Sequence, residues 1–162
     1  MNVLIIGGGV IGLAAARELR LAGAGRVTVL EKGRAGREAS WAAAGMLAPD
    51  AETETVDAMY RLCRRSNELY PEFAASLFDE TGIEIELDRT GTICVALSDE
   101  DLEHLGGRMA AQKTAGISAE LLSSTDIARL EPSLSRDVVG GVLYPDNGQV
   151  ENRKLVAALL EF

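Results

Sequence analysis

The stretch VLIIGGGVIG at residues 3–12 decides the fold of this chain. Four apolar residues come first, and Gly7, Gly9 and Gly12 then follow the spacing G-x-G-x-x-G. Glycines at this spacing permit a tight turn, a close approach of the backbone to a pyrophosphate, and close packing of a helix on a strand. Residues from about 10 to 22 have an apolar helical pattern. The stretch therefore predicts a strand, a turn and a helix whose amino terminus faces phosphate groups.

A second apolar run, residues 27–30, ends on Glu31. Glu31 lies nineteen residues beyond Gly12, where a carboxylate can accept hydrogen bonds from both hydroxyls of an adenosine ribose. The same acid disfavours a 2′-phosphate and therefore NADP. The alternative is a βαβ unit that binds no ligand. A strand, a helix ended by Gly23 and a second strand closing on an acid together favour a dinucleotide.

The composition describes one globular core and limits the partners. The chain has 162 residues, 47% of them apolar, and a net charge of −9. A phosphate backbone or an anionic lipid surface demands a basic footprint, so neither nucleic acid nor a membrane is expected as a partner. The apolar opening is too short and too rich in glycine for a signal peptide, and we expect a cytoplasmic setting.

Metal and thiol chemistry are not expected. Cys63 and Cys94 lie far apart without C-x-x-C spacing, which favours buried thiols over a metal or redox pair. His104 is the one histidine, and it lies on a predicted surface helix with no second histidine or cysteine near it in sequence. A surface position is favoured over a chemical role, and no metal site is expected. With no Ser-His-Asp set and no paired carboxylates in a motif, no residue is assigned as catalytic.

Small residues dominate the segment after Glu31. Residues 42–45 read Ala-Ala-Ala-Gly, and a backbone with so little side chain can lie flat against a large ligand. Ser40 is placed to cap the short helix that these residues begin. Composition alone allows a second interpretation, in which the run is a tight helix-packing surface.

These motifs resemble those of a known family. The glycine fingerprint, Glu31-Lys32 and the run from Ala39 to Pro49 resemble the amino-terminal part of the FAD-dependent amine and D-amino-acid oxidases, and most of all the glycine oxidases of thiamine biosynthesis. Trp41 departs from the pattern, in which a small residue is common. By this resemblance, FAD contacts fall on Gly7, Gly9 and Gly12 of the fingerprint, on Val10 and Ile11 at the pyrophosphate, on Glu31 and Lys32 at the adenosine, on Ala39 and Ser40 in the connecting loop, and on Ala44, Gly45 and Met46 nearest the isoalloxazine ring.

The middle of the chain predicts a different kind of structure. We expect helices over 54–80, 98–115 and 126–130, the second of them opened by a capping box of Ser98 with Asp101. We also expect strands over 83–87, 92–97 and 138–144, a turn at 145–148, and a final helix for which Asn152 is a candidate cap. The alternation of strands and helices is too sparse to continue a doubly wound sheet. The fold class is therefore α/β, a Rossmann-like FAD-binding βαβ unit with part of an inserted α+β antiparallel substrate domain, and the fold is incomplete. The expected domains are 1–82 with 149–162 for FAD, and 83–148 as part of the substrate-binding domain.

Two groups of side chains on the helix predicted over 54–80 have a structural interpretation. Tyr60 and Tyr70 recur at helical spacing, which is typical of core or boundary residues. Arg61, Arg64 and Arg65 are expected on the solvated side of the helix.

The resemblance implies a flavin-dependent oxidoreductase that oxidises glycine or a related small amino acid to the imine, with O2 as acceptor, for thiazole formation in thiamine biosynthesis. A homo-oligomer is compatible with it when the enzyme is intact. The alternatives are a D-amino-acid dehydrogenase or sarcosine oxidase on the same scaffold, or a non-catalytic FAD-binding half that needs a partner chain. An NAD-dependent enzyme with the same fingerprint is a third alternative, and the Ala-Ala-Ala-Gly-Met run argues against it.

The end of the sequence carries a further expectation. The last helical pattern stops at Glu161-Phe162 without a glycine, an asparagine or a basic final turn, and is interpreted as an interrupted helix in the amino-terminal portion of an enzyme. The first strand of such a fold needs neighbours on both sides, so exposed sheet edges are expected. We therefore predict that this chain alone holds FAD poorly and does not turn over.

Overall fold

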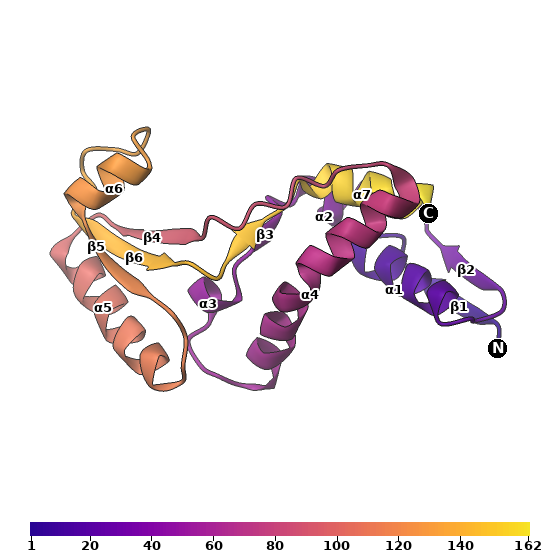
Figure 1. Cartoon of the computed structure of the whole chain (residues 1–162), viewed down its shortest axis with the longest axis horizontal. Helices are drawn as coiled ribbons and strands as arrows, with labels where there is room; N and C mark the ends of the chain where they lie inside the picture. Colours follow the sequence, from indigo (N-terminus) through magenta and orange to yellow (C-terminus); the bar gives the residue numbers. More distant parts are fainter. The chain divides into compact units, whose positions relative to one another are not determined.

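A computed structural model describes residues 1–162 as seven helices and seven strands (Figure 1). The chain divides into two compact units. Unit 1 comprises Met1–Met46, Leu69–Leu87 and Gln149–Phe162, and unit 2 comprises Leu47–Glu68 and Asp88–Gly148. Both units are discontinuous in sequence, and residues 47–68 group with unit 2 although the sequence placed them with the first domain. The assignment of the two units to cofactor and substrate stays a prediction.

Unit 1 begins with the predicted strand, helix and strand. Strand β1 (Val3–Ile6) and strand β2 (Val27–Leu30) pair in parallel, with Val3 opposite Val27 and Ile6 opposite Leu30. Helix α1 (Val10–Leu21) connects them, and α7 (Asn152–Glu161) packs against α1 and against the short helix α2 (Ala39–Ala42). The buried apolar side chains of this unit come from α1, α7 and the segments 69–87 and 149–151: Leu13, Leu77, Ile85, Val150, Leu155, Val156, Ala158 and Leu159.

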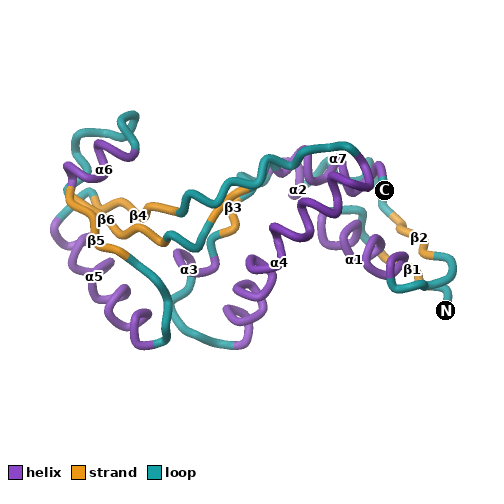
Figure 2. The backbone as a smooth tube through the Cα atoms, in the orientation of Figure 1, coloured by secondary structure: helices purple, strands orange, loops and turns teal.

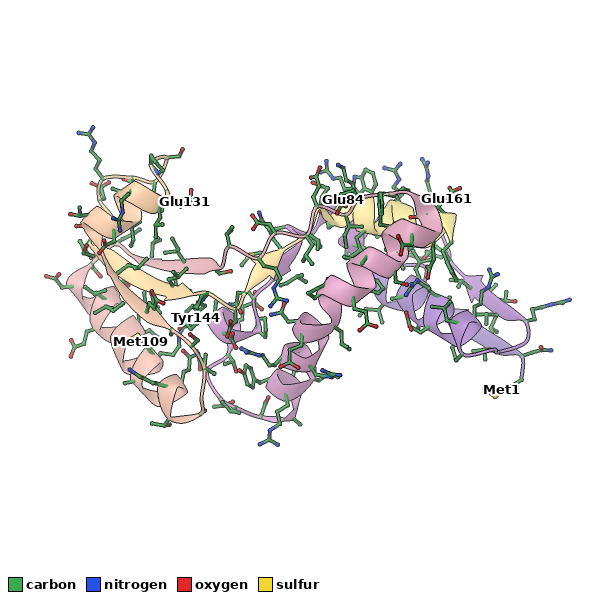
Figure 3. All side chains as sticks on the ribbon, viewed as in Figure 1. Met1, Glu84, Met109, Glu131, Tyr144 and Glu161 are labelled. Carbon is green, nitrogen blue, oxygen red and sulfur yellow. The ribbon has the colours of Figure 1, made fainter.

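Unit 2 is built on an antiparallel sheet, as predicted. Its order is β4 (Thr92–Ala96), β6 (Gly140–Tyr144), β5 (Glu120–Ser123), with Thr92 opposite Tyr144 and Ser123 opposite Gly140. Helix α5 (Asp99–Thr114) packs on β4 and β6, and α6 (Ser124–Leu130) packs on β5 and β6 (Figure 2). The core beneath α5 includes Tyr144, which is fully buried (Figure 3). Strand β5 was not predicted from the sequence.

The remaining elements are short except for one long helix. Helix α3 (Pro49–Glu52) precedes α4 (Ala58–Thr81), which contains Pro71. Strands β3 (Met46–Leu47) and β7 (Gly148–Gln149) form a two-stranded pair. No helix is both long enough and apolar enough to span a membrane.

Capping residues begin two helices of unit 2. At α5, Ser98 Oγ accepts a hydrogen bond from the Asp101 backbone N–H at 3.1 Å, as the sequence predicted. At α6, Ser123 and Asp126 form a complete capping box. Such a cap contributes about 1 kcal/mol to helix stability because it satisfies N–H groups that have no partner within the helix.

Two local predictions were wrong. Residues 83–87 alternate in burial as expected, with Ile85 buried between exposed glutamates, but they form no strand. Glu86 has a φ of 54°, which interrupts extended backbone. Ile85 O accepts a backbone hydrogen bond from the N–H of Glu151, the residue before α7. The cap of α7 is Glu151, whose carboxylate accepts from Arg153 N, so Asn152 occupies the first helical position instead.

The first strand leaves apolar surface uncovered. Strand β1 is hydrogen-bonded to β2 alone, and the side chains of Leu4 and Ile6 are 59% and 85% exposed. Leu30 on β2 is also exposed. Because β1 has a strand neighbour on one side alone, it has the exposed edge that the sequence predicted. A parallel pair is normally buried on both faces, and the exposed side chains show that these faces are uncovered as well.

Candidate dinucleotide site

The turn between β1 and α1 has a backbone that requires glycine at two positions. Gly7 has a φ of 106°, a conformation that side chains disfavour. A Cβ at Gly12 would lie 2.0 Å from the carbonyl oxygen of Gly7, so a side chain there would push α1 away from the turn. Close packing of helix on turn is the role that the fingerprint assigns to the third glycine.

The amino terminus of α1 is capped from a distant segment. Its cap residue, Gly9, supplies no side-chain acceptor, and the Val10 N–H donates to Ser40 Oγ at 2.9 Å. The prediction that Ser40 caps its own short helix was wrong, because α2 begins after Glu38 and has no side-chain cap. Ser40 instead joins the loop at residues 33–42 to the start of α1.

Glu31 lies directly after β2 and faces the glycine turn. Its Oε2 accepts a hydrogen bond from Gly8 N at 2.8 Å, and its Oε1 accepts from Gly33 N at 3.0 Å. These two backbone hydrogen bonds lower the pKa of the carboxyl below its usual value, so the side chain is ionised at neutral pH. An ionised carboxylate accepts more than two hydrogen bonds and has capacity left for ribose hydroxyls.

These segments line one cavity of about 160 Å³. Four predicted residues meet there, namely Gly9, Glu31, Ala39 and Ser40. Sequence reasoning missed its other lining residues, which are Arg34, Gly36, Arg37 and Glu38. The signal for the two arginines was their place in a glycine-containing loop after the acid, where a cation suits an anionic ligand.

The other predicted residues lie outside this cavity. Lys32 is 79% exposed and forms an ion pair with Glu38 at 3.4 Å. Ile11, on the first turn of α1, is 83% exposed. Ala44 and Met46 are also exposed.

Gly45 has a structural reason to be glycine. Its φ is 79°, and a Cβ there would lie 1.9 Å from the carbonyl oxygen of Val150. Its own carbonyl accepts from Val150 N at 2.9 Å. Of the two interpretations of the Ala-Ala-Ala-Gly run, close backbone packing explains this glycine, while the three exposed alanines remain free to face a ligand.

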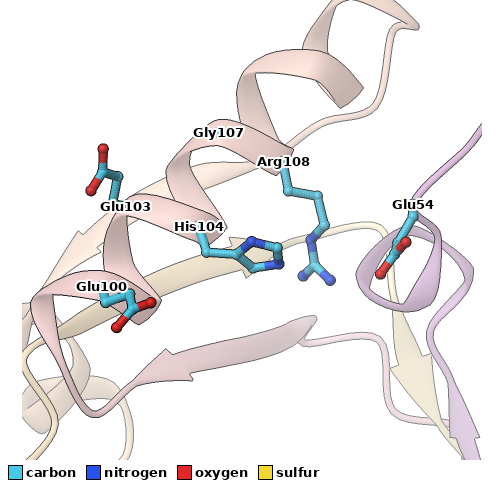
Figure 4. Close-up of a pocket in the computed structure, with 6 residues that line it drawn as sticks. All are labelled: Glu54, Glu100, Glu103, His104, Gly107 and Arg108. Atoms are coloured by element: carbon cyan, nitrogen blue, oxygen red, sulfur yellow. The ribbon is translucent and has the colours of Figure 1, made fainter.

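A larger cavity of about 490 Å³ lies in unit 2 beside α5 (Figure 4). It is lined by Glu54, Glu100, Glu103, His104, Gly107 and Arg108. Its three glutamates are exposed and disfavour an anionic ligand, and His104 has no hydrogen-bonded acid or nucleophile beside it. No three His, Cys, Asp or Glu side chains of the chain are grouped to hold a metal ion. The larger cavity therefore lacks side chains that would bind an anion, hold a metal ion or act in catalysis. The smaller cavity is the candidate functional site.

A buried ionic centre stabilises unit 2. The Asp50 carboxylate is fully buried and accepts hydrogen bonds from the Tyr60 hydroxyl and from Arg64 Nη1, both at 2.8 Å. Arg64 also pairs with Asp146 at 3.1 Å. Arg64 was expected on the solvated face, and this was wrong because a buried carboxylate needs a cationic partner. Cys63 is exposed and Cys94 half-buried, so the expectation of two buried thiols was also wrong.

The parallel strand pair, the glycine turn and the acid after β2 define a dinucleotide-binding βαβ unit. A family model described as FAD dependent oxidoreductase, DAO, matches residues 2–162. The chain belongs to this family of FAD-dependent oxidoreductases.

Its relatives include glycine oxidases. The chain is 45% identical over 98% of its length to the bifunctional protein ThiO/ThiG of Trichormus variabilis, and 36% identical over 98% of its length to the glycine oxidase of Geobacillus kaustophilus. The crystal structure of the latter enzyme aligns over 97% of this chain with a TM-score of 0.91, and that of the glycine oxidase from Bacillus cereus aligns over 98% with a TM-score of 0.89. The chain spans 24% of the first relative and 42% of the glycine oxidases of Geobacillus kaustophilus and Bacillus cereus.

The residues present fit the adenosine and pyrophosphate of FAD. The start of α1 offers backbone N–H groups with no side chain from Gly9 to block them, and Glu31 offers carboxylate oxygens within the same cavity. Arg34 and Arg37 add positive charge beside these groups. These residues therefore suit FAD, the cofactor of the family, and all of them belong to unit 1.

Proposed function

We propose that this chain supplies the FAD-binding part of a cytoplasmic oxidoreductase that oxidises glycine or a related small amino acid to the imine. O2 is the acceptor, and the product serves thiazole formation in thiamine biosynthesis. The observation that carries the proposal is the cavity in which Gly9, Glu31 and Ser40 meet. The relatives named as glycine oxidases support the substrate class.

The residues of the chain act by binding and orientation. The N–H groups at the start of α1 hold the pyrophosphate, Glu31 holds the ribose hydroxyls, and Arg34 and Arg37 balance the phosphate charge. When bound, FAD supplies the two-electron oxidation of the amine. No side chain in the candidate site acts as a general base or nucleophile in this proposal.

A titration of the 162-residue chain with FAD, NAD⁺ and NADP⁺ tests the cofactor class. We expect saturable but weak binding of FAD, weaker binding of NAD⁺, and none of NADP⁺, because the Glu31 carboxylate repels a 2′-phosphate. Glu31→Gln keeps the shape of the side chain and removes its charge, and should weaken FAD binding about tenfold. Equal affinity for FAD and NADP⁺, or an unchanged affinity in Glu31→Gln, would contradict the assignment.

A chimera tests the activity. Residues 1–162 would replace the matching part of the Geobacillus kaustophilus glycine oxidase, to which they are 36% identical. We expect about one FAD per chimeric chain and H2O2 formation with glycine, whereas the 162-residue chain alone gives no H2O2. A correctly folded chimera that purifies without flavin would overturn the proposal.

A second candidate is a non-catalytic flavin-binding partner. The chain is 31% identical over 98% of its length to a mouse protein named pyruvate dehydrogenase phosphatase regulatory subunit, mitochondrial. If the chimera binds flavin but produces no H2O2 from glycine, sarcosine or D-amino acids, this candidate replaces the oxidase.

A further inference from the structure

We propose that Asn152 is a positioning residue of the cofactor site, which fixes the loop that carries Ser40 without touching the cofactor. The inference rests on the proposed function and adds a residue that the fingerprint does not include. Asn152 Nδ2 donates to the carbonyl oxygen of Ser40 at 2.7 Å and to that of Trp41 at 3.1 Å. The amide thus serves two successive carbonyls, 112 and 111 residues away in sequence.

The loop depends on these contacts because α2 is a single turn. Helix α2 spans Ala39–Ala42, and such a short helix leaves its last carbonyls without intrahelical partners. A helix of one turn is also unstable by itself, since the cost of nucleation is not recovered by propagation. Asn152, fixed at the first position of α7, supplies donors to two of those carbonyls.

Ser40 links its loop to the start of α1 by a hydrogen bond. Its hydroxyl oxygen accepts from the Val10 N–H, while its carbonyl oxygen accepts from Asn152. Asn152, Ser40 and Val10 therefore form one connected series of hydrogen bonds from α7 to the amino terminus of α1. Because Ser40 also lines the cavity, a shift of this loop changes the shape of the site.

Trp41 gives this arrangement an optical readout. It is the single tryptophan of the chain. The guanidinium carbon of Arg37 lies 3.6 Å from its ring centroid, and that of Arg153, the residue after Asn152, lies 5.3 Å away. The indole is half-buried between the loop and α7, so its emission reports whether the two stay together.

Asn152→Asp removes the donors while keeping the size of the side chain. A carboxylate at the first position of a helix is favourable, so α7 is expected to persist with an unchanged far-UV circular dichroism spectrum. The carboxylate repels the carbonyl oxygens of Ser40 and Trp41. In the flavin-free 162-residue chain we expect red-shifted Trp41 emission and about twofold stronger acrylamide quenching, together with FAD affinity lowered about tenfold, which corresponds to about 1.4 kcal/mol.

Two further variants keep the test specific. Lys154→Gln changes an exposed residue of the same helix that pairs with Glu86, and should leave Trp41 emission and FAD affinity unchanged. Ser40→Ala removes the bond to Val10 but keeps the backbone carbonyls, and should weaken FAD binding without altering Trp41 emission.

The outcomes separate this inference from the proposed function. If the chimera with the Geobacillus kaustophilus enzyme folds but purifies without flavin, the proposed function fails, while the quenching of Trp41 in Asn152→Asp still decides whether Asn152 positions the loop. The inference is overturned if Trp41 has the same emission and the same quenching in Asn152→Asp as in the wild type, whatever the affinity for FAD.

Discussion

Arg17 on α1 and Glu80 near the end of α4 form a two-point salt bridge within unit 1. Arg17 Nε lies 2.7 Å from Glu80 Oε2, and Nη2 lies 2.6 Å from Oε1. The Arg17 side chain is 3% exposed and also donates to Ser76 Oγ at 2.7 Å. The guanidinium carbon of Arg17 lies 5.2 Å from the centroid of the Phe73 ring. A buried cation with this set of partners holds α1, whose amino terminus forms the candidate site, against α4.

Glu80→Gln should destabilise unit 1 by about 2 kcal/mol at pH 7, because it leaves the buried Arg17 guanidinium with a single ionic partner, the exposed Glu18, whose Oε1 lies 2.6 Å from Arg17 Nη1. Urea unfolding measures the change, with Glu72→Gln on the exposed side of the same helix as control.

The same pair predicts a pH dependence. Its hydrogen bond to Arg17 lowers the pKa of Glu80 below the usual 4.5. The stabilisation is therefore present above about pH 4.5 and is lost as pH falls through the lowered folded-state pKa. The difference in stability between the wild type and Glu80→Gln should narrow below that pH. A difference that stays constant down to about pH 2 would contradict the role of this salt bridge.

Gly12→Ala should abolish FAD binding, because its Cβ would meet the Gly7 carbonyl oxygen at 2.0 Å and displace α1. Gly106→Ala on α5 is the matched control, since nothing lies within 4 Å of a Cβ there. The control should leave FAD binding unchanged and raise stability by about 0.5–1 kcal/mol, because alanine favours a helix interior. Flavin fluorescence titration and thermal unfolding of both variants check these expectations. If Gly12→Ala and Gly106→Ala bound FAD with equal affinity, the close packing of Gly12 on Gly7 would have no role in cofactor binding.

Tyr60→Phe should lower the stability of unit 2 by about 1–2 kcal/mol, because it removes a hydrogen-bond donor from the buried Asp50 carboxylate. Burial, followed by the Asp50 carboxylate, raises the pKa of Tyr60 from 10 to about 12. The protonated Tyr60 hydroxyl therefore contributes its full stabilisation of unit 2 below pH 10, and this stabilisation is lost as pH rises through about 12. Burial also raises the pKa of Tyr70, so absorbance titration near 295 nm should show a late tyrosine ionisation that is smaller in Tyr60→Phe than in the wild type. A late ionisation of equal size in both would refute the buried contact.

Cys63 should react quickly with a thiol reagent in the folded chain, because it is exposed on α4, whereas Cys94 is half-buried in β4. Modification by DTNB should show one fast thiol, and Cys63→Ser should remove that phase. Two thiols that both react only on unfolding would restore the prediction made from the sequence.

The sequence predicted the parts of the fold whose signals are local. The glycine fingerprint predicted β1, α1 and β2, and Ser98 with Asp101 predicted the start of α5. Strand β5 was missed because its four residues, Glu120–Ser123, are mostly exposed and show little alternation. Its assignment depends on pairing with β6, and no local pattern records that.

Contacts between distant residues account for the errors at the site. The hydroxyl of Ser40 was assigned to its own helix, yet its partner is Val10, thirty residues earlier. Arg64 was assigned to solvent, because nothing near it in sequence shows that Asp50 is buried beside it. The fingerprint residues were predicted because their spacing itself encodes the turn, while the arginines of the cavity depend on how the loop folds back.

Gly45 changes how the small-residue run should be used as a marker. Because the Val150 carbonyl leaves no room for a side chain, a library that randomises residues 42–45 should accept most substitutions at the three exposed alanines and reject nearly all at the glycine. Selection for a folded chain would preserve that glycine even with no flavin present. The glycine of a small-residue run therefore indicates the packing of Gly45 on Val150. Glu31 and the glycine fingerprint are the residues that indicate flavin binding.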